Sequence, residues 1–173
     1  MSIEKIREAI RDVPDFPKPG ILFKDITPAL QDPDRLREIG DLFYERYKDL
    51  NIDKVACIDA RGFIFGGLIA TRLGAGLVTV RKAGKLPYDV IEESYELEYG
   101  SATLAIHVDA IKKGERVVIL DDLLATGGTA AATIQLVEAL DGDIVELGFL
   151  VELGFLEGRK RLGDSPAWAP IVY

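Results

Sequence analysis

Cysteine, histidine and long apolar runs are scarce in this sequence, and each scarcity excludes a class of protein. The single cysteine, Cys57, lies in the apolar run from Val55 to Ile58, which excludes a disulfide framework and favours a buried side chain over a nucleophile. No apolar run approaches the length of a membrane span, and the segment after Met1 is charged rather than a signal region. We therefore expect a soluble cytoplasmic protein that does not bind membranes.

Basic residues are outnumbered, with 21 Lys and Arg against 29 Asp and Glu, which gives a net charge of -8 and a pI near 4.7. Nucleic-acid binders usually carry a basic excess, so this balance argues against a nucleic-acid partner. Any site for an anion must therefore be built from a few local cations. The only histidine, His107, stands in a segment that alternates like a strand, and we assign it no role.

At 173 residues, the chain fits one domain with a full hydrophobic core. Apolar, β-branched runs alternate with segments of helical spacing, which is typical of α/β proteins with a mostly parallel central sheet. In such sheets, ligands bind beyond the carboxyl ends of the strands. Strands are predicted at 54–59, 77–80, 101–108, 117–120 and 143–151, and helices at 2–12, from 33 onward, at 63–73, 130–140 and 157–162.

The stretch from Arg116 to Leu140 carries the strongest functional signal. Its apolar run from Val117 to Leu120 predicts a strand buried on both faces, and a segment of helical composition begins at Ala130. The loop from Ala125 to Thr129 offers two glycines that admit an oxygen-rich group, two threonine hydroxyls, and the free N–H groups of a helix start. We expect this loop to hold a phosphate. It is not a Walker P-loop, because no lysine precedes the threonine at the helix start.

Asp121 and Asp122 stand between that strand and that loop. Two carboxylates beside a phosphate repel it unless something between them accepts or neutralises their charge. Sugar hydroxyls can do so, and so can a divalent metal ion. A phosphorylated ribose combines a phosphate with a vicinal diol, so the acids and the loop together indicate a phosphorylated pentose.

Four cations follow the carboxyl ends of two other predicted strands. Arg61 comes soon after one of them, and Arg81, Lys82 and Lys85 come after the next. Because ligands of open α/β sheets bind at this edge, we expect the four cations to converge there with the phosphate loop. The sequence thus predicts a locally cationic site in an acidic protein.

From Val117 to Thr129 the sequence resembles the signature of type I phosphoribosyltransferases, which bind 5-phosphoribosyl-1-pyrophosphate. The resemblance implies an α/β fold with a mostly parallel central sheet flanked by helices, and with a small hood and a flexible hairpin over the active site. For this chain it implies a single domain over 1–173, a hood from about 1–30 plus the C-terminal segment, and a mobile loop at about 86–104.

Four further stretches resemble the adenine-specific members of that family in the same order along the chain. They are Pro19–Pro28, Asp59–Phe63, Arg81–Pro87 and Tyr95–Gly100. This similarity implies a purine salvage reaction in which adenine and 5-phosphoribosyl-1-pyrophosphate give AMP and pyrophosphate. It also implies Mg²⁺ carried by the substrate near Asp121 and Asp122 without a direct protein site, and a homodimer whose other partners are these small molecules.

The resemblance assigns the loop and the cations to the two phosphate groups of the substrate. The 5-phosphate is expected against Ala125, Thr126, Gly127, Gly128 and Thr129. The pyrophosphate is expected against Arg61, Arg81, Lys82 and Lys85. Asp121 and Asp122 are expected to hold the ribose diol near the developing cation, so the predicted catalytic set is Glu98, Asp121, Asp122 and Arg61.

The adenine ring is expected between Phe23 and Leu153, with its edge read by backbone groups around Leu22 and Lys24. Lys24 stands where many members of the family have arginine, which weakens any bidentate contact there. From its place in an apolar run, Phe23 can also be a core residue. Its role in stacking therefore depends on the resemblance.

Glu98 is the candidate proton donor to the purine, and Tyr99 is the candidate lid residue that excludes water. Both roles come from the resemblance. Glu98 can also be one more solvated acid among its neighbours, and the residue pattern alone leaves that alternative open.

Two other functions stay open. The first is a phosphoribosyltransferase for another base, such as xanthine or a 6-oxopurine. The second is a non-catalytic regulator that kept the sugar site as a ligand sensor, although such proteins usually add a basic DNA-binding extension and this acidic chain shows none.

One short motif is repeated. Glu146 to Leu150 reads ELGFL, and the same five residues recur from Glu152 to Leu156. The repeat is too short for a solenoid unit. We expect one copy inside the strand at 143–151 and the other beyond its end.

Overall fold

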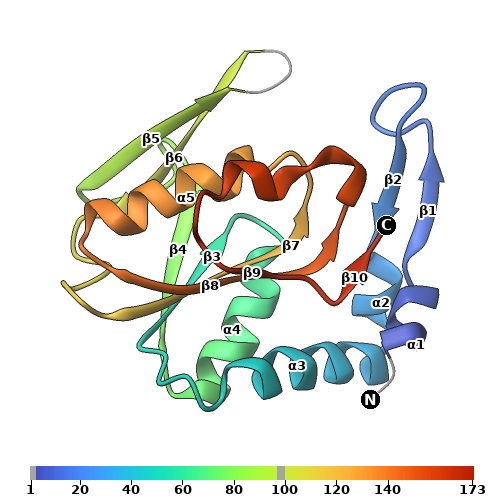
Figure 1. Ribbon diagram of the computed structural model, residues 1–173, viewed down its shortest axis with the longest axis horizontal. Coiled ribbons are helices and arrows are strands. Elements are labelled where there is room, and N and C mark those ends of the chain that lie inside the picture. Colours follow the sequence, from blue (N-terminus) through green and yellow to red (C-terminus); the bar gives the residue numbers. More distant parts are fainter. Residues whose placement is uncertain (1–2, 97–99) are drawn as a thin grey trace. The chain divides into compact units, whose positions relative to one another are not determined.

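The computed structural model describes residues 3–96 and 100–173 (Figure 1). The chain forms two compact units, one up to Glu45 and the other from Arg46 to Tyr173. The hood predicted from about 1–30 plus the C-terminal segment stays a prediction. None of the helices in the described residues has the length and apolar character of a membrane span.

The N-terminal unit is built around a short antiparallel hairpin, in which Val13 pairs with Phe23. The predicted helix over 2–12 is wrong at its end, because the helix stops at Glu8 and the chain enters a strand at Arg11. The reason is long-range, since strand pairing satisfies the backbone of this segment better than another helical turn before Pro14. The elements are α1 (Ile3–Glu8), β1 (Arg11–Pro14), β2 (Leu22–Asp25), α2 (Thr27–Gln31) and α3 (Pro33–Tyr47), which crosses the unit boundary.

The larger unit contains an eight-stranded sheet in the order β10-β8-β7-β3-β4-β6-β5, with β9 paired to β8. The strands from β10 to β4 run parallel, and β6 and β5 add an antiparallel hairpin at one edge. The predicted mostly parallel sheet and its hairpin are confirmed. The strands are β3 (Lys54–Ile58), β4 (Gly76–Lys82), β5 (Val90–Glu96), β6 (Ser101–His107), β7 (Arg116–Leu124), β8 (Asp143–Glu152), β9 (Ala167–Trp168) and β10 (Ile171–Val172).

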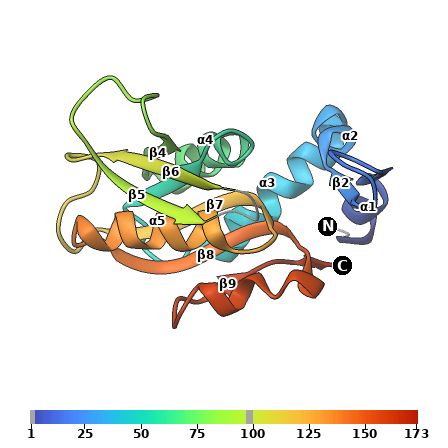
Figure 2. The ribbon, with the colours of Figure 1, turned by 90° about the horizontal axis from the view of Figure 1, so that it is seen from above.

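Two helices of the larger unit, α4 (Gly62–Leu73) and α5 (Gly128–Ala139), cover opposite faces of this sheet (Figures 1 and 2). On one face, Gly66 lets α4 approach β3 closely, because a methyl group at Gly66 would overlap the sulfur of Cys57. Burial raises the pKa of that thiol, which supports a packing role for Cys57. Gly67, the next residue, has open space where a methyl group would lie and so does not take part in this close approach.

Two short 3-10 helices, η1 (Gly154–Leu156) and η2 (Gly158–Arg161), follow β8. The sequence predicted one helix at 157–162, and η2 takes its place as a single tight turn. The central strand β7 is buried along Val117 to Leu120, as a strand between two parallel neighbours requires. Its carboxyl end leads directly into α5, and the candidate site lies there.

Candidate active site

Strand β7 continues through both acidic residues and ends at Leu124, four residues beyond the predicted run. It does so because Leu123 and Leu124 still pair with β8. The loop is therefore only Ala125 to Gly127, and α5 begins at Gly128. Gly127 adopts a φ of +82°, a left-handed conformation that favours glycine at this helix cap. The predicted order of strand, tight loop and helix is confirmed.

A small hollow lies at the start of α5. It has a volume of about 80 Å³ and is lined by residues 123–130 together with Asp121 and Phe149. The residue at the N-cap is Gly127, which has no side chain to accept a hydrogen bond from the first N–H groups of the helix. Unsatisfied N–H groups at a helix start, with the positive end of the dipole, favour an anion in this hollow.

Residues distant in sequence surround the start of α5. A methyl group built on Gly128 would lie 3.0 Å from Cδ2 of Tyr95 and 3.4 Å from Nη1 of Arg161. The hydroxyl of Thr129 donates a hydrogen bond to the hydroxyl of Tyr95 at 3.1 Å. Sequence reasoning assigned no role to Tyr95 or Arg161, because neither stands beside the loop in the chain.

The two acids of β7 differ in their surroundings. Asp122 is buried, with 4% of its surface exposed, and its carboxylate accepts a hydrogen bond from Nε of Arg61. A carboxylate oxygen of Asp121 accepts a hydrogen bond of 2.9 Å from the backbone N–H of Asp122. Desolvation and the neighbouring Asp122 carboxylate raise the pKa of Asp121 well above its ordinary value. The pair can therefore accept hydrogen bonds from hydroxyl groups, and Asp121 holds a proton more readily than an exposed aspartate.

The start of α4 packs against these acids. A methyl group at Gly62 would lie 2.8 Å from the carbonyl oxygen of Leu120 and 3.2 Å from a carboxylate oxygen of Asp121. Because Gly62 has no side chain, Arg61 comes within hydrogen-bond reach of Asp122. The structure thus brings Arg61 together with the paired acids at the end of β7.

The other three cations lie at the end of β4, the parallel neighbour of β3: Arg81 and Lys82 are the last two residues of the strand, and Lys85 follows it. Nε of Arg81 donates to the carboxylate of Asp59 at 2.8 Å, and its Nη1 donates to the carbonyl of Lys85 at 3.2 Å. The side chains of Lys82 and Lys85 are exposed. The larger unit therefore presents four cations and the loop from Ala125 to Gly127 at the carboxyl ends of three neighbouring parallel strands.

The residues expected around the base lie in different units. Leu22, Phe23 and Lys24 form part of β2 in the N-terminal unit, where the rings of Phe23 and Phe16 pack edge to face at 5.2 Å. Leu153 belongs to the larger unit, where its N–H donates to the carbonyl of Leu124. Glu98 and Tyr99 lie outside the described residues.

A hollow of about 280 Å³ in the N-terminal unit is lined by Val13, Phe16, Phe23 and Asp25. Asp25 closes one side, where its carboxylate accepts hydrogen bonds from the backbone N–H of Thr27 at 2.9 Å and from Arg11 at 2.6 Å. Hydrogen bonds with Thr27 and Arg11 lower the pKa of Asp25 to about 2. This hollow offers an aromatic face to an apolar ring.

The described residues contain no cluster of three or more histidine, cysteine or acidic side chains placed to hold a metal ion. In β7, which leads into the loop, the acidic residues are Asp121 and Asp122. Magnesium in phosphate sites usually keeps its waters and is bound by one or two carboxylates plus substrate oxygens. The pair fits an ion that arrives with a phosphorylated substrate.

Comparison with known proteins agrees with this geometry. The model of the phosphoribosyl transferase domain matches residues 27–166. That range contains the cations, the paired acids and the loop. The chain therefore belongs to the phosphoribosyl transferase family.

Individual relatives narrow the class. The chain is 54% identical to the adenine phosphoribosyltransferase of an Anaeromyxobacter species, over 99% of this chain and 97% of the relative. The crystal structure of adenine phosphoribosyltransferase from Thermoanaerobacter pseudethanolicus matches with a TM-score of 0.96 and 48% identity, over 99% of this chain and 100% of that one. The Saccharomyces cerevisiae enzyme, crystallised with an imino-altritol bisphosphate and adenine, matches with a TM-score of 0.92 and 40% identity over 96% and 97% of the two chains. Within the family, the chain falls among the adenine phosphoribosyltransferases.

Proposed function

We propose that this chain transfers the 5-phosphoribosyl group from 5-phosphoribosyl-1-pyrophosphate to adenine, giving AMP and pyrophosphate. The observation that carries the proposal is the sequence of features at the end of β7: two acids, a loop with a left-handed glycine, and the open start of α5. A nitrogen of adenine forms the bond to the anomeric carbon while the bond from that carbon to pyrophosphate breaks. The electron pair leaves with pyrophosphate, and the net proton that the base loses is taken up by pyrophosphate or water.

The 5-phosphate is assigned to the loop from Ala125 to Thr129. The N–H groups at the start of α5 donate to its oxygens, and the threonine hydroxyls add donors. The hollow over these residues is supported as a phosphate site by its small volume of about 80 Å³ and by its position at a helix start.

The ribose is assigned to Asp121 and Asp122, whose carboxylates can accept hydrogen bonds from the vicinal hydroxyls. Positive charge develops on the sugar as the leaving group departs. Negative charge fixed nearby stabilises that transition state more than the ground state. Arg61 holds one of the two carboxylates in place.

The leaving pyrophosphate is assigned to Arg61, Arg81, Lys82 and Lys85. These cations lie at or after the carboxyl ends of β3 and β4, on one side of β7 in the sheet, and a polyanion needs such donors to depart. When bound, Mg²⁺ would neutralise pyrophosphate and ribose oxygens beside Asp121 and Asp122. We also propose that the protein is a homodimer in which some of these cations reach the pyrophosphate site of the other subunit.

Adenine is assigned to Phe23 and Leu153, with backbone groups around Leu22 and Lys24 at its edge. Backbone carbonyls accept from a 6-amino group, whereas recognition of a 6-oxo group needs a donor or a cation, and neither neighbour of Leu153 in the chain is basic. Glu98 is assigned as proton donor to the purine and Tyr99 as the lid residue. The yeast relative crystallised with adenine supports this choice of base.

Incubation of the purified protein with 5-phosphoribosyl-1-pyrophosphate, Mg²⁺ and one base at a time tests the proposal. We expect AMP and pyrophosphate from adenine, with kcat/KM about a hundredfold or more above that for hypoxanthine, guanine or xanthine. Nucleotide formation from hypoxanthine or xanthine but not adenine would refute the choice of base. Tight binding of the sugar without release of pyrophosphate would favour the ligand sensor instead. A cytoplasmic location stays a prediction of the sequence.

A further inference from the structure

The 3-10 helix η2 packs against the loop after β7 through the backbone of Gly158, and the side chain of its last residue, Arg161, lies near Gly128. A methyl group at Gly127 would overlap the carbonyl oxygen of Gly158, and a methyl group at Gly158 would overlap the carbonyl oxygen of Ala125. The same position on Gly158 lies 3.1 Å from the backbone nitrogen of Gly127. Gly158 is buried in this contact. The outer side of the loop is therefore shaped by a segment that begins about thirty residues later in the chain.

The turn that contains Gly158 cannot hold this position by itself. It has only four residues, from Gly158 to Arg161, and the residue before it, Glu157, adopts a φ of +52°. Short 3-10 turns have poor hydrogen-bond geometry, and a left-handed non-glycine residue adds strain. Side-chain contacts therefore help to hold η2 in place, and one of them is made by the buried Leu162 directly after the turn.

Arg159 supplies another anchor. Its Nε donates to both carboxylate oxygens of Glu152 at 2.9 Å, and its Nη2 donates to one of them at 2.6 Å. Its Nη1 donates to the carbonyl of Ala167 in β9 at 2.6 Å. Glu152 is 7% exposed, and the ion pair with it raises the pKa of Arg159. Each of the three guanidinium nitrogens thus donates to a residue of the sheet, and together they tie η2 to two strands.

Glu152 connects this anchor to the start of the loop. It is the last residue of β8 and pairs with Leu124, the last residue of β7 before the loop. The next residue, Leu153, donates its N–H to the carbonyl of Leu124 at 2.9 Å. Glu152 therefore joins the two parts: its backbone pairs with the strand that enters the loop, and its carboxylate holds the turn that packs behind the loop.

We infer that the Arg159–Glu152 pair is a positioning device for the 5-phosphate site. It presses Gly158 against the loop and so keeps the N–H groups near Gly127 aimed at one point. Arg159 is a positioning residue, because it acts through Gly158 and the loop rather than by touching the substrate. The inference rests on the proposed role of the loop as the phosphate site.

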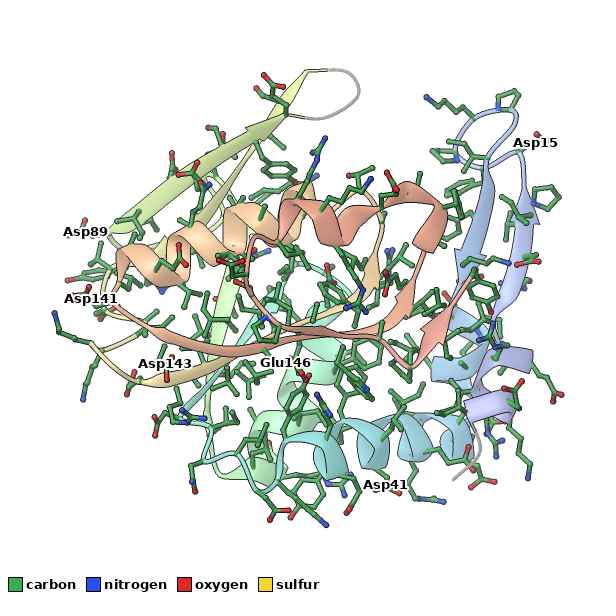
Figure 3. The ribbon with its side chains drawn as sticks, viewed as in Figure 1. Asp15, Asp41, Asp89, Asp141, Asp143 and Glu146 are labelled. Atoms are coloured by element: carbon green, nitrogen blue, oxygen red, sulfur yellow. The ribbon has the colours of Figure 1, made fainter. Side chains whose placement is uncertain are left out.

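The same strand offers a matched control. Glu146, labelled in Figure 3, is also 7% exposed and also accepts a fork, from Nη2 of Arg46 at 2.5 Å and Nε of Arg46 at 2.9 Å. Arg46 in turn stacks over Trp168 at 5.7 Å. Glu146 pairs with Val118, early in β7, and not with the residues at the loop. The two ion pairs match in chemistry and burial and differ in which part of β7 they face.

Three single variants test the inference: Arg159→Lys, Arg46→Lys and Gly158→Ala. Lysine keeps the charge but cannot reproduce the fork. The measurements are the affinities for ribose 5-phosphate and for pyrophosphate by calorimetry, the melting temperature, and the KM values for both substrates. We expect Arg159→Lys to lower the affinity for ribose 5-phosphate about tenfold, because a small misplacement of the loop N–H groups costs this much. The affinity for pyrophosphate should stay within about twofold of wild type. Gly158→Ala should lower the affinity for ribose 5-phosphate further.

Arg46→Lys should lower the melting temperature about as much as Arg159→Lys and leave ribose 5-phosphate affinity within about twofold of wild type. Equal weakening by the two lysine variants, or unchanged affinity in Arg159→Lys, would overturn the inference. Binding is measured without turnover, so the inference can hold even if no AMP is formed. A failure to form AMP would refute only the proposed reaction. A wild-type protein that bound no ribose 5-phosphate would overturn both.

Discussion

Arg61 donates a hydrogen bond from Nε to the buried carboxylate of Asp122. The arginine follows β3 and the acid ends β7, so one contact joins two parallel strands at the edge where they end. In the proposed reaction, it links a cation of the pyrophosphate site to an acid of the ribose site. Removal of either side chain should therefore disturb both sites at once.

We expect Arg61→Ala and Asp122→Ala each to lower kcat by about 10²- to 10³-fold, the size of effect seen when one donor to a developing charge is removed. Steady-state kinetics with adenine measures this. Arg116→Ala is the control, because Arg116 starts β7 at the opposite edge and pairs with Asp143 at 3.1 Å. Arg116→Ala should keep wild-type kcat. A kcat within about twofold of wild type for Arg61→Ala would remove Arg61 from the chemistry.

The raised pKa of Asp121 makes stability depend on pH. Because folding raises this pKa, the folded state binds the proton more tightly than the unfolded chain does. Ionisation therefore lowers the free energy of unfolding as pH rises from about 3.9 through the folded-state pKa, and the loss is complete above it. Asparagine keeps an acceptor for the Asp122 N–H but carries no charge.

Asp121→Asn should therefore melt above wild type at pH 7 by on the order of a few °C, and the difference should shrink as the pH falls toward 4. Thermal unfolding at several pH values measures it, and activity should be lost at the same time. Asp89→Asn, at an exposed position labelled in Figure 3, is the control and should melt like wild type. A lower melting temperature for Asp121→Asn at pH 7 would contradict the argument.

Tyr95 of β5 contacts the start of α5 through its hydroxyl, which accepts a hydrogen bond from Thr129. A hydroxyl rotates freely, so Tyr95 can donate to Thr129 when the threonine donates to a phosphate. Loss of one neutral hydrogen bond costs about 0.5–1.5 kcal/mol, so Tyr95→Phe should lower the affinity for ribose 5-phosphate about two- to tenfold. Titration calorimetry checks this, with Tyr88→Phe as the control at a hydroxyl that is exposed. Tighter binding by Tyr95→Phe would show instead that Tyr95 competes with phosphate.

Local patterns were enough to predict the core of the larger unit. The run from Val117 to Leu120 could only be a central strand, and glycines after acids could only be a tight turn into a helix. Contacts between distant segments were not predictable in this way. Nothing near Gly158 in the sequence indicates that it packs on Ala125, and the hairpin of β1 and β2 was hidden by the prolines between its strands.

The repeated ELGFL motif shows where a signal was present but was not understood. One copy lies in β8, and the other leaves the strand after Glu152, as expected. The structure adds that both glutamates are buried and that each is held by an arginine, Arg46 for Glu146 and Arg159 for Glu152. A buried carboxylate requires such a partner. Two glutamates at the head of identical apolar motifs thus could have prompted a search for two arginines.

Phe23 gives the most direct test of the base site. Its ring lines the hollow of the N-terminal unit and packs against Phe16. Stacking on an aromatic ring contributes about 1–3 kcal/mol per base, so Phe23→Ala should raise the KM for adenine by about 5- to 150-fold and leave the KM for 5-phosphoribosyl-1-pyrophosphate nearly unchanged. Phe23→Tyr keeps the π face and should stay within a few-fold of wild type, whereas Phe23→Leu keeps only apolar bulk and should resemble alanine. Full activity in Phe23→Leu would mean that burial alone matters and that no ring stacks there.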